Sequence, residues 1–249
     1  MDYTVAIKPI AILKAGEAYP SMVETQGDYE DWIRAAIGAA ASAVKVVDAR
    51  TADPLPESNQ FAGAVITGSH AMVTDREPWS EALKQWTVRA VRDGLPILGI
   101  CYGHQLLAHA LGGEVEQRSQ GVEIGTVTVA CTERANVDPL FADVPERFLA
   151  QTVHWQSVTR LPDGAVRLAR SDADQNHAFR YGENAWGVQF HPEYSAEIMG
   201  AYVDVLAKQL TKQGLDAVEL RRLVKPSTEA PSILSAFARY ATSQLLSGR

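Results

Sequence analysis

The chain has 249 residues, of which 46% are hydrophobic and 21% charged, a composition typical of a soluble globular protein. This length suits one large α/β domain or two smaller domains. The formal net charge of −7, with no run of lysine or arginine to offset it, disfavours nucleic acid as a partner.

Segments that direct a protein to a membrane or out of the cell are not expected. The first residues, Met1-Asp2-Tyr3, are not a basic segment leading into an apolar core, as a secretory signal would be. No apolar run is long enough to cross a bilayer, so we expect no membrane partner. The two cysteines, Cys101 and Cys131, give no disulfide framework. We therefore expect a cytoplasmic protein.

Strands and helices alternate over the first 113 residues, with short connections between them. This alternation predicts an α/β protein with a three-layer, flavodoxin-like architecture, in which helices cover both faces of a mostly parallel sheet. Ligands in such sheets gather at the carboxyl ends of the strands. The expected strands are Val5–Ile10, Val44–Asp48, Ala62–Ile66 and Leu95–Ile100, and the expected helices start after Asp28, Glu77 and Cys101.

The remainder of the chain has a different pattern. Short alternating runs in residues 114–131 and 147–191 predict added β-hairpins, and the last of them, Trp186–Phe190, is a buried strand. Apolar residues at helical spacing predict a closing helix over Ser195–Leu210 and two more helices in the tail. We expect one domain over residues 1–249, with a core of about 1–212 and a C-terminal helical extension over 213–249.

Cys101 lies at a turn from strand to helix, between Gly99 and Gly103. This is the nucleophile-elbow pattern with cysteine in place of serine. A tight turn needs small neighbours, because side chains at the two glycines would collide with the adjoining strand and helix. The helix N-terminus favours a thiolate and offers free N–H groups to a developing oxyanion. We interpret Cys101 as a nucleophile rather than a packed thiol.

A nucleophilic thiolate needs a base and a group that orients the base, and His191 and Glu193 supply this pair just after the last strand. An α/β-hydrolase would place the acid before the histidine, so that fold is disfavoured. A zinc deaminase would need a Cys-x-x-Cys after its His-x-Glu, and no cysteine follows Cys131, so we expect no metal. His177, within a polar segment, is expected at an exposed turn.

Together, Gly99–Gln105 and His191–Glu193 resemble the paired motifs of the class I (triad) glutamine amidotransferases. Thr67-Gly68-Ser69 is similar to the loop that completes the oxyanion hole of that family. The resemblance covers roughly residues 40–210. The segment Gly27–Asp31 and the undivided length make the chain similar to the stand-alone, GMP-synthase-like members.

The resemblance implies a mechanism without a cofactor. Cys101 would attack the γ-carboxamide of glutamine, His191 would protonate the departing amine and then activate water, and Glu193 would hold the imidazole. The N–H groups of Gly68 and Tyr102 would bind the oxyanion. His70, in the same loop as Gly68, is expected to contact ligand, and the other implied substrate-binding residues are Gln105, Trp155 and Gln156.

Three functions share these motifs. The first is a glutaminase that donates ammonia to a separate acceptor or synthetase protein, since we find no synthetase domain in this chain. The second is hydrolysis of other γ-glutamyl amides or peptides, which passes through the same thioester. The third is a non-catalytic regulatory subunit of the same fold, which the intact Cys-His-Glu set disfavours.

Overall fold

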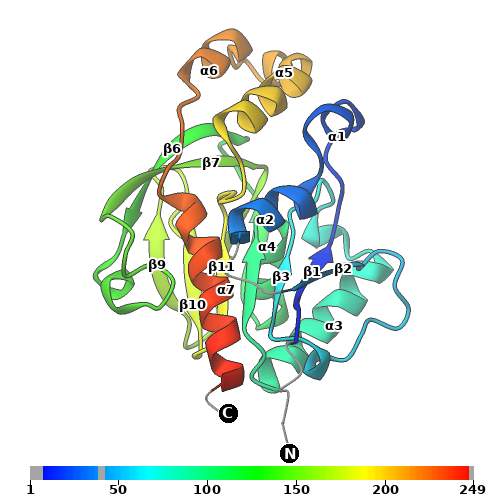
Figure 1. The fold of residues 1–249 in the computed structure, drawn as a ribbon. Coiled ribbons are helices and arrows are strands. Elements are labelled where there is room, and N and C mark those ends of the chain that lie inside the picture. The colour runs from blue at the N-terminus through cyan, green and yellow to red at the C-terminus, as the bar shows by residue number, and fades with distance from the viewer. Residues whose placement is uncertain (1–7, 39–42, 247–249) are drawn as a thin grey trace, which may run out of the picture.

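The computed structural model describes residues 8–38 and 43–246 (Figure 1). Its main feature is a nine-stranded sheet with the order β2-β1-β3-β4-β11-β10-β9-β6-β7. The first five strands in this order are parallel. They are β2 (Val44–Asp48), β1 (Ile10–Lys14), β3 (Gly63–Ile66), β4 (Ile97–Ile100) and β11 (Ala185–Val188).

The sheet continues beyond β11 as an antiparallel extension. A separate two-stranded ribbon pairs β5 with β8. This second half of the sheet corresponds to the hairpins that the alternating sequence runs predict. The antiparallel strands are β10 (Ala178–Tyr181), β9 (Val166–Arg170), β6 (Glu123–Cys131) and β7 (Arg147–His154), and the ribbon strands are β5 (Glu114–Gln117) and β8 (Gln156–Arg160).

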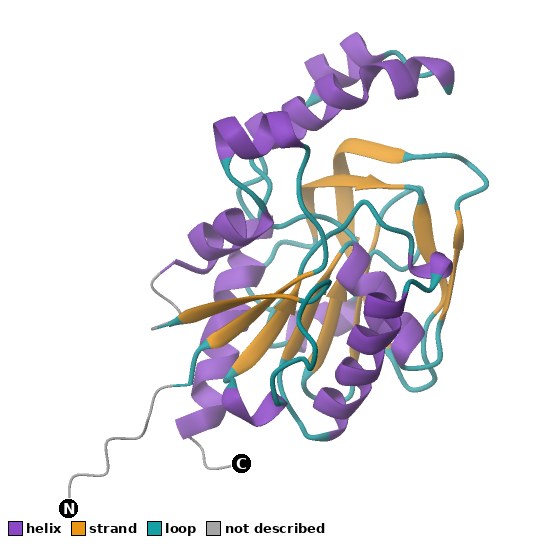
Figure 2. Cartoon of the chain, turned by 90° about the vertical axis from the view of Figure 1, so that its right-hand side faces the viewer, coloured by secondary structure: helices purple, strands orange, loops and turns teal. Residues whose placement is uncertain are grey.

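Helices cover both faces of the parallel strands (Figures 1 and 2). Helices α2 and α7 pack on one face, and α3 and α4 pack on the other. Short 3₁₀ turns lie at Ser58–Gln60, Val73–Asp75 and Glu133–Val137. The helices are α1 (Pro20–Gln26), α2 (Tyr29–Ile37), α3 (Pro78–Arg92), α4 (Tyr102–Ala110), α5 (Ala196–Lys212), α6 (Ala217–Leu223) and α7 (Ala230–Leu246).

Strand β1 shows why the sheet has two hydrophobic faces. Its side chains alternate: Ile10 and Ile12 pack under α2 and α7, whereas Ala11 and Leu13 pack against the α3 and α4 side. All four are almost fully buried. A strand buried on both faces needs an uninterrupted apolar run, which is the usual pattern in parallel sheets covered by helices.

The predicted fold class is confirmed, but the predicted first strand, Val5–Ile10, is wrong at Lys8 and Pro9. The strand begins at Ile10 and ends at Lys14. Pro9 has no N–H to donate to a ladder and precedes the strand, and the apolar run that follows it provides the residues buried on both faces. Residues 5–7 lie outside the described part of the chain.

The C-terminal third contributes two different features. Helices α5 and α6 form an arm that projects beyond the sheet (Figures 1 and 2). Helix α7 returns to the sheet and contributes Ile233, Leu234 and Phe237 to the core. Within residues 8–38 and 43–246, no helix is both long enough and apolar enough to cross a membrane.

Candidate active site

Cys101 occupies the turn between β4 and α4, and its φ is +50°. This conformation is costly for a residue with a side chain, so the surrounding packing must hold it. A Cβ at Gly99 would overlap the carbonyl of Gly103, and a Cβ at Gly103 would overlap the carbonyl of Ile66 in β3. The two glycines therefore let α4 start directly against the sheet, as the elbow pattern predicts.

Sheet register brings His191 to this turn. Strand β11 pairs in parallel with β4, with Val188 opposite Ile100, and the Cys101 N–H donates to the Val188 carbonyl at 2.9 Å. Three residues later, the His191 N–H donates to the carbonyl of Gln151 at 2.8 Å and so ties the loop to β7. The two motifs are distant in sequence but follow adjacent strand ends.

The His191 ring is held on two sides. Its Nδ1–H donates to Glu193 Oε1 at 2.7 Å, and Tyr194 stacks on the ring with centroids 3.9 Å apart. Burial lowers the pKa of His191, but the nearby Glu193 and Cys101, each with a side-chain hydrogen bond to the ring, raise it to about 10. The ring is thus an imidazolium at neutral pH, placed to donate a proton beside the sulfur.

The predicted oxyanion donors lie on either side of this pair. Tyr102 is the first residue of α4, where backbone N–H groups have no partner within the helix. Gly68 lies two residues after β3 ends at Ile66, and a Cβ at Gly68 would lie 2.9 Å from His191 Cε1. Only glycine therefore lets this loop approach the imidazole.

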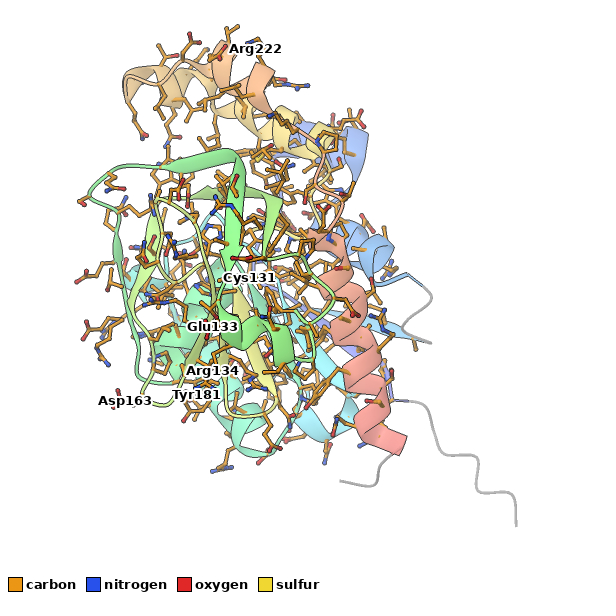
Figure 3. All side chains as sticks on the ribbon, turned by 90° about the vertical axis from the view of Figure 1, so that its left-hand side faces the viewer. Cys131, Glu133, Arg134, Asp163, Tyr181 and Arg222 are labelled. Carbon is orange, nitrogen blue, oxygen red and sulfur yellow. The ribbon has the colours of Figure 1, made fainter. Side chains whose placement is uncertain are left out.

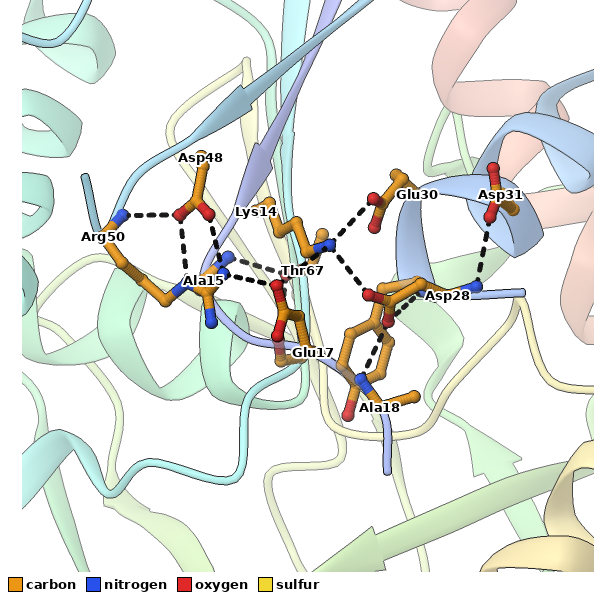
Figure 4. A network of polar contacts seen from close by, with 12 residues as sticks. Lys14, Ala15, Glu17, Ala18, Asp28, Glu30, Asp31, Asp48, Arg50 and Thr67 are labelled. Carbon is orange, nitrogen blue, oxygen red and sulfur yellow. Dashed lines mark hydrogen bonds and ion pairs between the residues drawn. The ribbon is translucent and has the colours of Figure 1, made fainter. Parts of the chain in front are cut away.

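Thr67 fixes the Gly68 loop to its neighbours. Its hydroxyl donates to the Gly68 carbonyl at 2.8 Å and accepts from the Ala15 N–H at 2.9 Å (Figure 4). The adjoining Lys14 ammonium donates to Asp28 at 2.7 Å and to Glu30 at 2.8 Å. This network connects the ends of β1 and β3 to the start of α2.

Asp28 caps α2 and so determines where Tyr29 lies. Its carboxylate accepts from the Tyr29 and Ala18 N–H groups, each at 2.8 Å, and Asp31 completes a capping box (Figure 4). The Tyr29 ring lies parallel to His191 at 6.3 Å, and its hydroxyl bonds that of Tyr202 at 2.8 Å. The N-terminal segment thereby forms one wall of the site.

A cavity of about 250 Å³ is lined by Cys101 and His191. All four residues predicted to bind substrate line it. Gln105 has a second task, because its amide donates to the Gln156 carbonyl at 2.8 Å and thereby fixes the β7–β8 loop. The four predicted substrate-binding residues that line the cavity are Gln105, His70, Trp155 and Gln156.

Three further tyrosines, which are not among the predicted site residues, also line the cavity. Tyr29 is the first residue of α2, and Tyr202 comes from the apolar stripe of α5. Tyr19 stacks on His70 with centroids 4.3 Å apart, and no sequence signal marks it. The apolar stripe of α5 includes Tyr202, but the stripe alone does not predict that this part of the helix lies over the site.

Cys131 is separate from the cavity. It is the last residue of β6 and is half-buried (Figure 3). Burial raises the pKa of the Cys131 thiol to about 11, so it carries little thiolate at neutral pH. The two cysteines therefore differ in environment as the sequence predicts.

Comparison with known proteins identifies the family. A family model described as "Glutamine amidotransferase class-I" matches residues 22–208, which include the elbow and the His191–Glu193 pair. The chain belongs to the class I glutamine amidotransferase family. A solved glutamine amidotransferase from Methylobacillus flagellatus superposes with a TM-score of 0.72 and 25% identity, covering 98% of this chain and 96% of that one.

Curated relatives fall into two groups. The GMP synthase of Thermomicrobium roseum is 39% identical over 57% of this chain but only 25% of its own length. A γ-glutamyl-L-1-hydroxyisopropylamide hydrolase from a Pseudomonas species is 29% identical, over 82% of this chain and 72% of its own length. The chain therefore spans a small part of the synthases that it matches and most of the hydrolase.

Proposed function

We propose that this protein hydrolyses the γ-carboxamide of glutamine through a thioester on Cys101. Ammonia is released for an acceptor on a separate synthetase protein. The observation that carries the proposal is that Cys101 and the His191 imidazolium line one cavity, with Glu193 bonded to the His191 ring. A strained elbow, an oriented ring and a helix N-terminus are the parts that acyl transfer from an amide requires.

In the first half-reaction, the Cys101 thiolate attacks the γ-carbonyl carbon. The resulting oxyanion accepts hydrogen bonds from the Tyr102 and Gly68 N–H groups. His191 gives its Nε2 proton to the amide nitrogen as the C–N bond breaks. The products are ammonia and a γ-glutamyl thioester, and His191 is left neutral with Glu193 still accepting from Nδ1–H.

In the second half-reaction, neutral His191 takes a proton from water while the water oxygen attacks the thioester carbonyl. The C–S bond then breaks and releases glutamate, which restores the thiolate–imidazolium pair. Gln105, Trp155 and Gln156 are proposed to bind the amino-acid end of the substrate. The Trp155 indole nitrogen and Gln156 Oε1 support this, since neither has a hydrogen-bond partner within the described part of the chain.

Replacing Cys101 by alanine tests the nucleophile. We expect ammonia release from glutamine to fall by about 10⁴-fold or more, because no other group in the cavity forms the thioester. The matched control is Cys131→Ala, which should keep full turnover. An electrophilic glutamine analogue should label Cys101 and spare Cys131, detected by peptide mass spectrometry. Wild-type turnover in the Cys101 variant would exclude the proposed nucleophile.

A second candidate function is supported by the tyrosines of the cavity. Ammonia is small and needs no apolar wall, whereas Tyr19, Tyr29, Tyr202 and Leu206 all face the cavity beside His191. Such a wall favours an amine leaving group with carbon substituents. The substrate would then be a γ-glutamyl amide or peptide, the substrate class named for the Pseudomonas hydrolase relative.

Initial rates separate the two candidates. The values of kcat/KM for glutamine and γ-glutamyl isopropylamide should be compared, with Tyr202→Ala beside wild type. A preference for the amide that Tyr202→Ala reduces by about 10-fold supports the second candidate. A preference for glutamine supports the first. No turnover of either substrate, with no labelling of Cys101, would support a regulatory subunit instead.

The cytoplasm is the compartment that suits either chemistry. Cys101 and Cys131 are both free, and a thiolate nucleophile must stay reduced. We expect fractionation of cells to place the protein with reducing-compartment markers.

A further inference from the structure

Behind the substrate loop, three side chains that can bind metal meet in the interior. Glu123 and His154 form a cross-strand pair between β6 and β7, and His177 immediately precedes β10. Their exposed fractions are 8%, 3% and 0%. His177 was expected at an exposed turn, and that prediction is wrong: its ring stacks on Phe190, with centroids 5.8 Å apart.

The geometry of the three groups is close enough for a shared cation. His154 Nε2 lies 2.8 Å from Glu123 Oε2, and His177 Nε2 lies 3.2 Å from the same oxygen. The ligand atoms all lie within 4.8 Å of one another. Tetrahedral zinc with bonds of about 2.0–2.1 Å separates its ligand atoms by about 3.3 Å, so small shifts of the side chains are needed to bring all three to that spacing.

The hydrogen bonds of His154 show which nitrogen carries a proton. Its Nδ1 lies 2.7 Å from the Gln156 carbonyl, which also accepts from Gln105 Nε2 at 2.8 Å. A carbonyl cannot donate, so Nδ1 must be the donor. Nε2 is therefore the nitrogen that faces the Glu123 carboxylate, where either a proton or a metal ion can bridge the two groups.

We propose that Glu123 Oε2, His154 Nε2 and His177 Nε2 bind a divalent metal ion of the zinc type. Two histidines and one carboxylate are a common zinc donor set. One outer contact fits, since zinc-binding histidines usually donate their other N–H to a carbonyl or carboxylate, as His154 does to Gln156; His177 Nδ1 has no such partner within the described part of the chain. The other carboxylate oxygen, Glu123 Oε1, accepts from the Ser171 hydroxyl at 2.7 Å.

Two cavities border the cluster. Glu123 and Ser171 line an open cavity of about 420 Å³, and no residue lining it also lines the cavity of Cys101. His154 lines the Cys101 cavity itself. The effect of the ion would be positional, because His154 directly precedes the Trp155–Gln156 loop and holds the Gln156 carbonyl in place. The proposal is independent of the reaction assigned to Cys101.

Metal binding can be measured without turnover. The protein carries Cys101→Ala, so that the thiol and His191 do not bind the probe, and it is first treated with a chelator and dialysed. We expect isothermal titration with ZnCl₂ to show a single tight site and a rise in Tm. We expect His177→Gln, which keeps a hydrogen-bonding side chain of similar size, to weaken this binding by about 100-fold or more. His109→Gln, on a histidine outside the cluster, should leave it unchanged.

If His177→Gln fails to fold, a second measurement uses the protein that keeps all three ligand side chains. The ring-nitrogen NMR signal of His154 Nε2 should shift on addition of zinc in the Cys101→Ala protein, while Nδ1 keeps its proton. Two results would overturn the proposal. One is the absence of saturable zinc binding, and the other is binding that His177→Gln leaves unaltered. Either result would mean that a proton, not a metal, holds Glu123 and His154 together.

Discussion

At the scale of the residue, the position of the Cys101 sulfur depends on the absence of side chains at Gly99 and Gly103. The elbow holds Cys101 at φ +50° because α4 starts directly against β3 and β4. That close approach depends on hydrogen atoms at Gly99 and Gly103. The strained backbone is thus maintained by packing around it, and any group added at the contact must displace backbone rather than a flexible side chain.

Gly103→Ala tests this account of the elbow. The new methyl would overlap the carbonyl of Ile66, so we expect the free energy of unfolding to fall by about 3 kcal/mol. Ammonia release should fall too, because the sulfur shifts. Gly112→Ala is the control: Gly112 has φ +93° but open space around it, so it should cost only about 1 kcal/mol. Urea unfolding measures both, and equal losses would show that packing does not hold the elbow.

The sequence reveals some residues of the site and conceals others, for a physical reason. Cys101 and His191 are visible because each lies within a local motif and at a strand end, where parallel sheets gather their ligands. Glu123, His154 and His177 are not visible as a set. They meet through the register of antiparallel strands, and neither the β6–β7 pairing nor the position of β10 can be read from local spacing.

At the scale of the element, helix α7 belongs to the core of the sheet. Its side chains Ile233, Leu234 and Phe237 are fully buried, and it packs beside α2. Apolar periodicity predicts such a helix, but not whether it covers the core or meets a partner, because periodicity gives a face without naming its neighbour. For β1, the apolar residues can be read from the sequence, but the point after Pro9 at which the strand begins cannot.

Phe237→Ala tests the contribution of α7. Removing this ring leaves a cavity among buried residues, so we expect a loss of about 3–5 kcal/mol in the free energy of unfolding. Val218→Ala on α6 is the matched control, since Val218 is 80% exposed and should change stability by no more than about 0.5 kcal/mol. A two-state urea transition should be kept in both. A small loss at Phe237 would mean that α7 folds apart from the sheet.

At the scale of the whole molecule, the proposed site lies where the two halves of the sheet and the C-terminal arm meet. The parallel strands supply Cys101, the antiparallel extension supplies the Trp155–Gln156 loop, and α5 supplies Tyr202. His191 is bonded to both halves, through β11 and through Gln151 of β7. Its charge state therefore contributes to the stability of the complete fold as well as to chemistry.

The pH dependence of unfolding should report this charge. The pKa of His191 is raised from 6.5 to about 10 in the folded protein. A group with a raised pKa contributes its stability in full below pH 6.5 and loses it as the pH rises toward 10. Glu193→Gln removes a charge that raises this pKa. We expect the variant to be about 2 kcal/mol less stable than wild type at pH 6, with the difference shrinking toward pH 10. The control is Glu133→Gln, since Glu133 is exposed, and its stability should match that of wild type at every pH (Figure 3). A stability difference between Glu193→Gln and wild type that stays constant with pH would contradict the imidazolium.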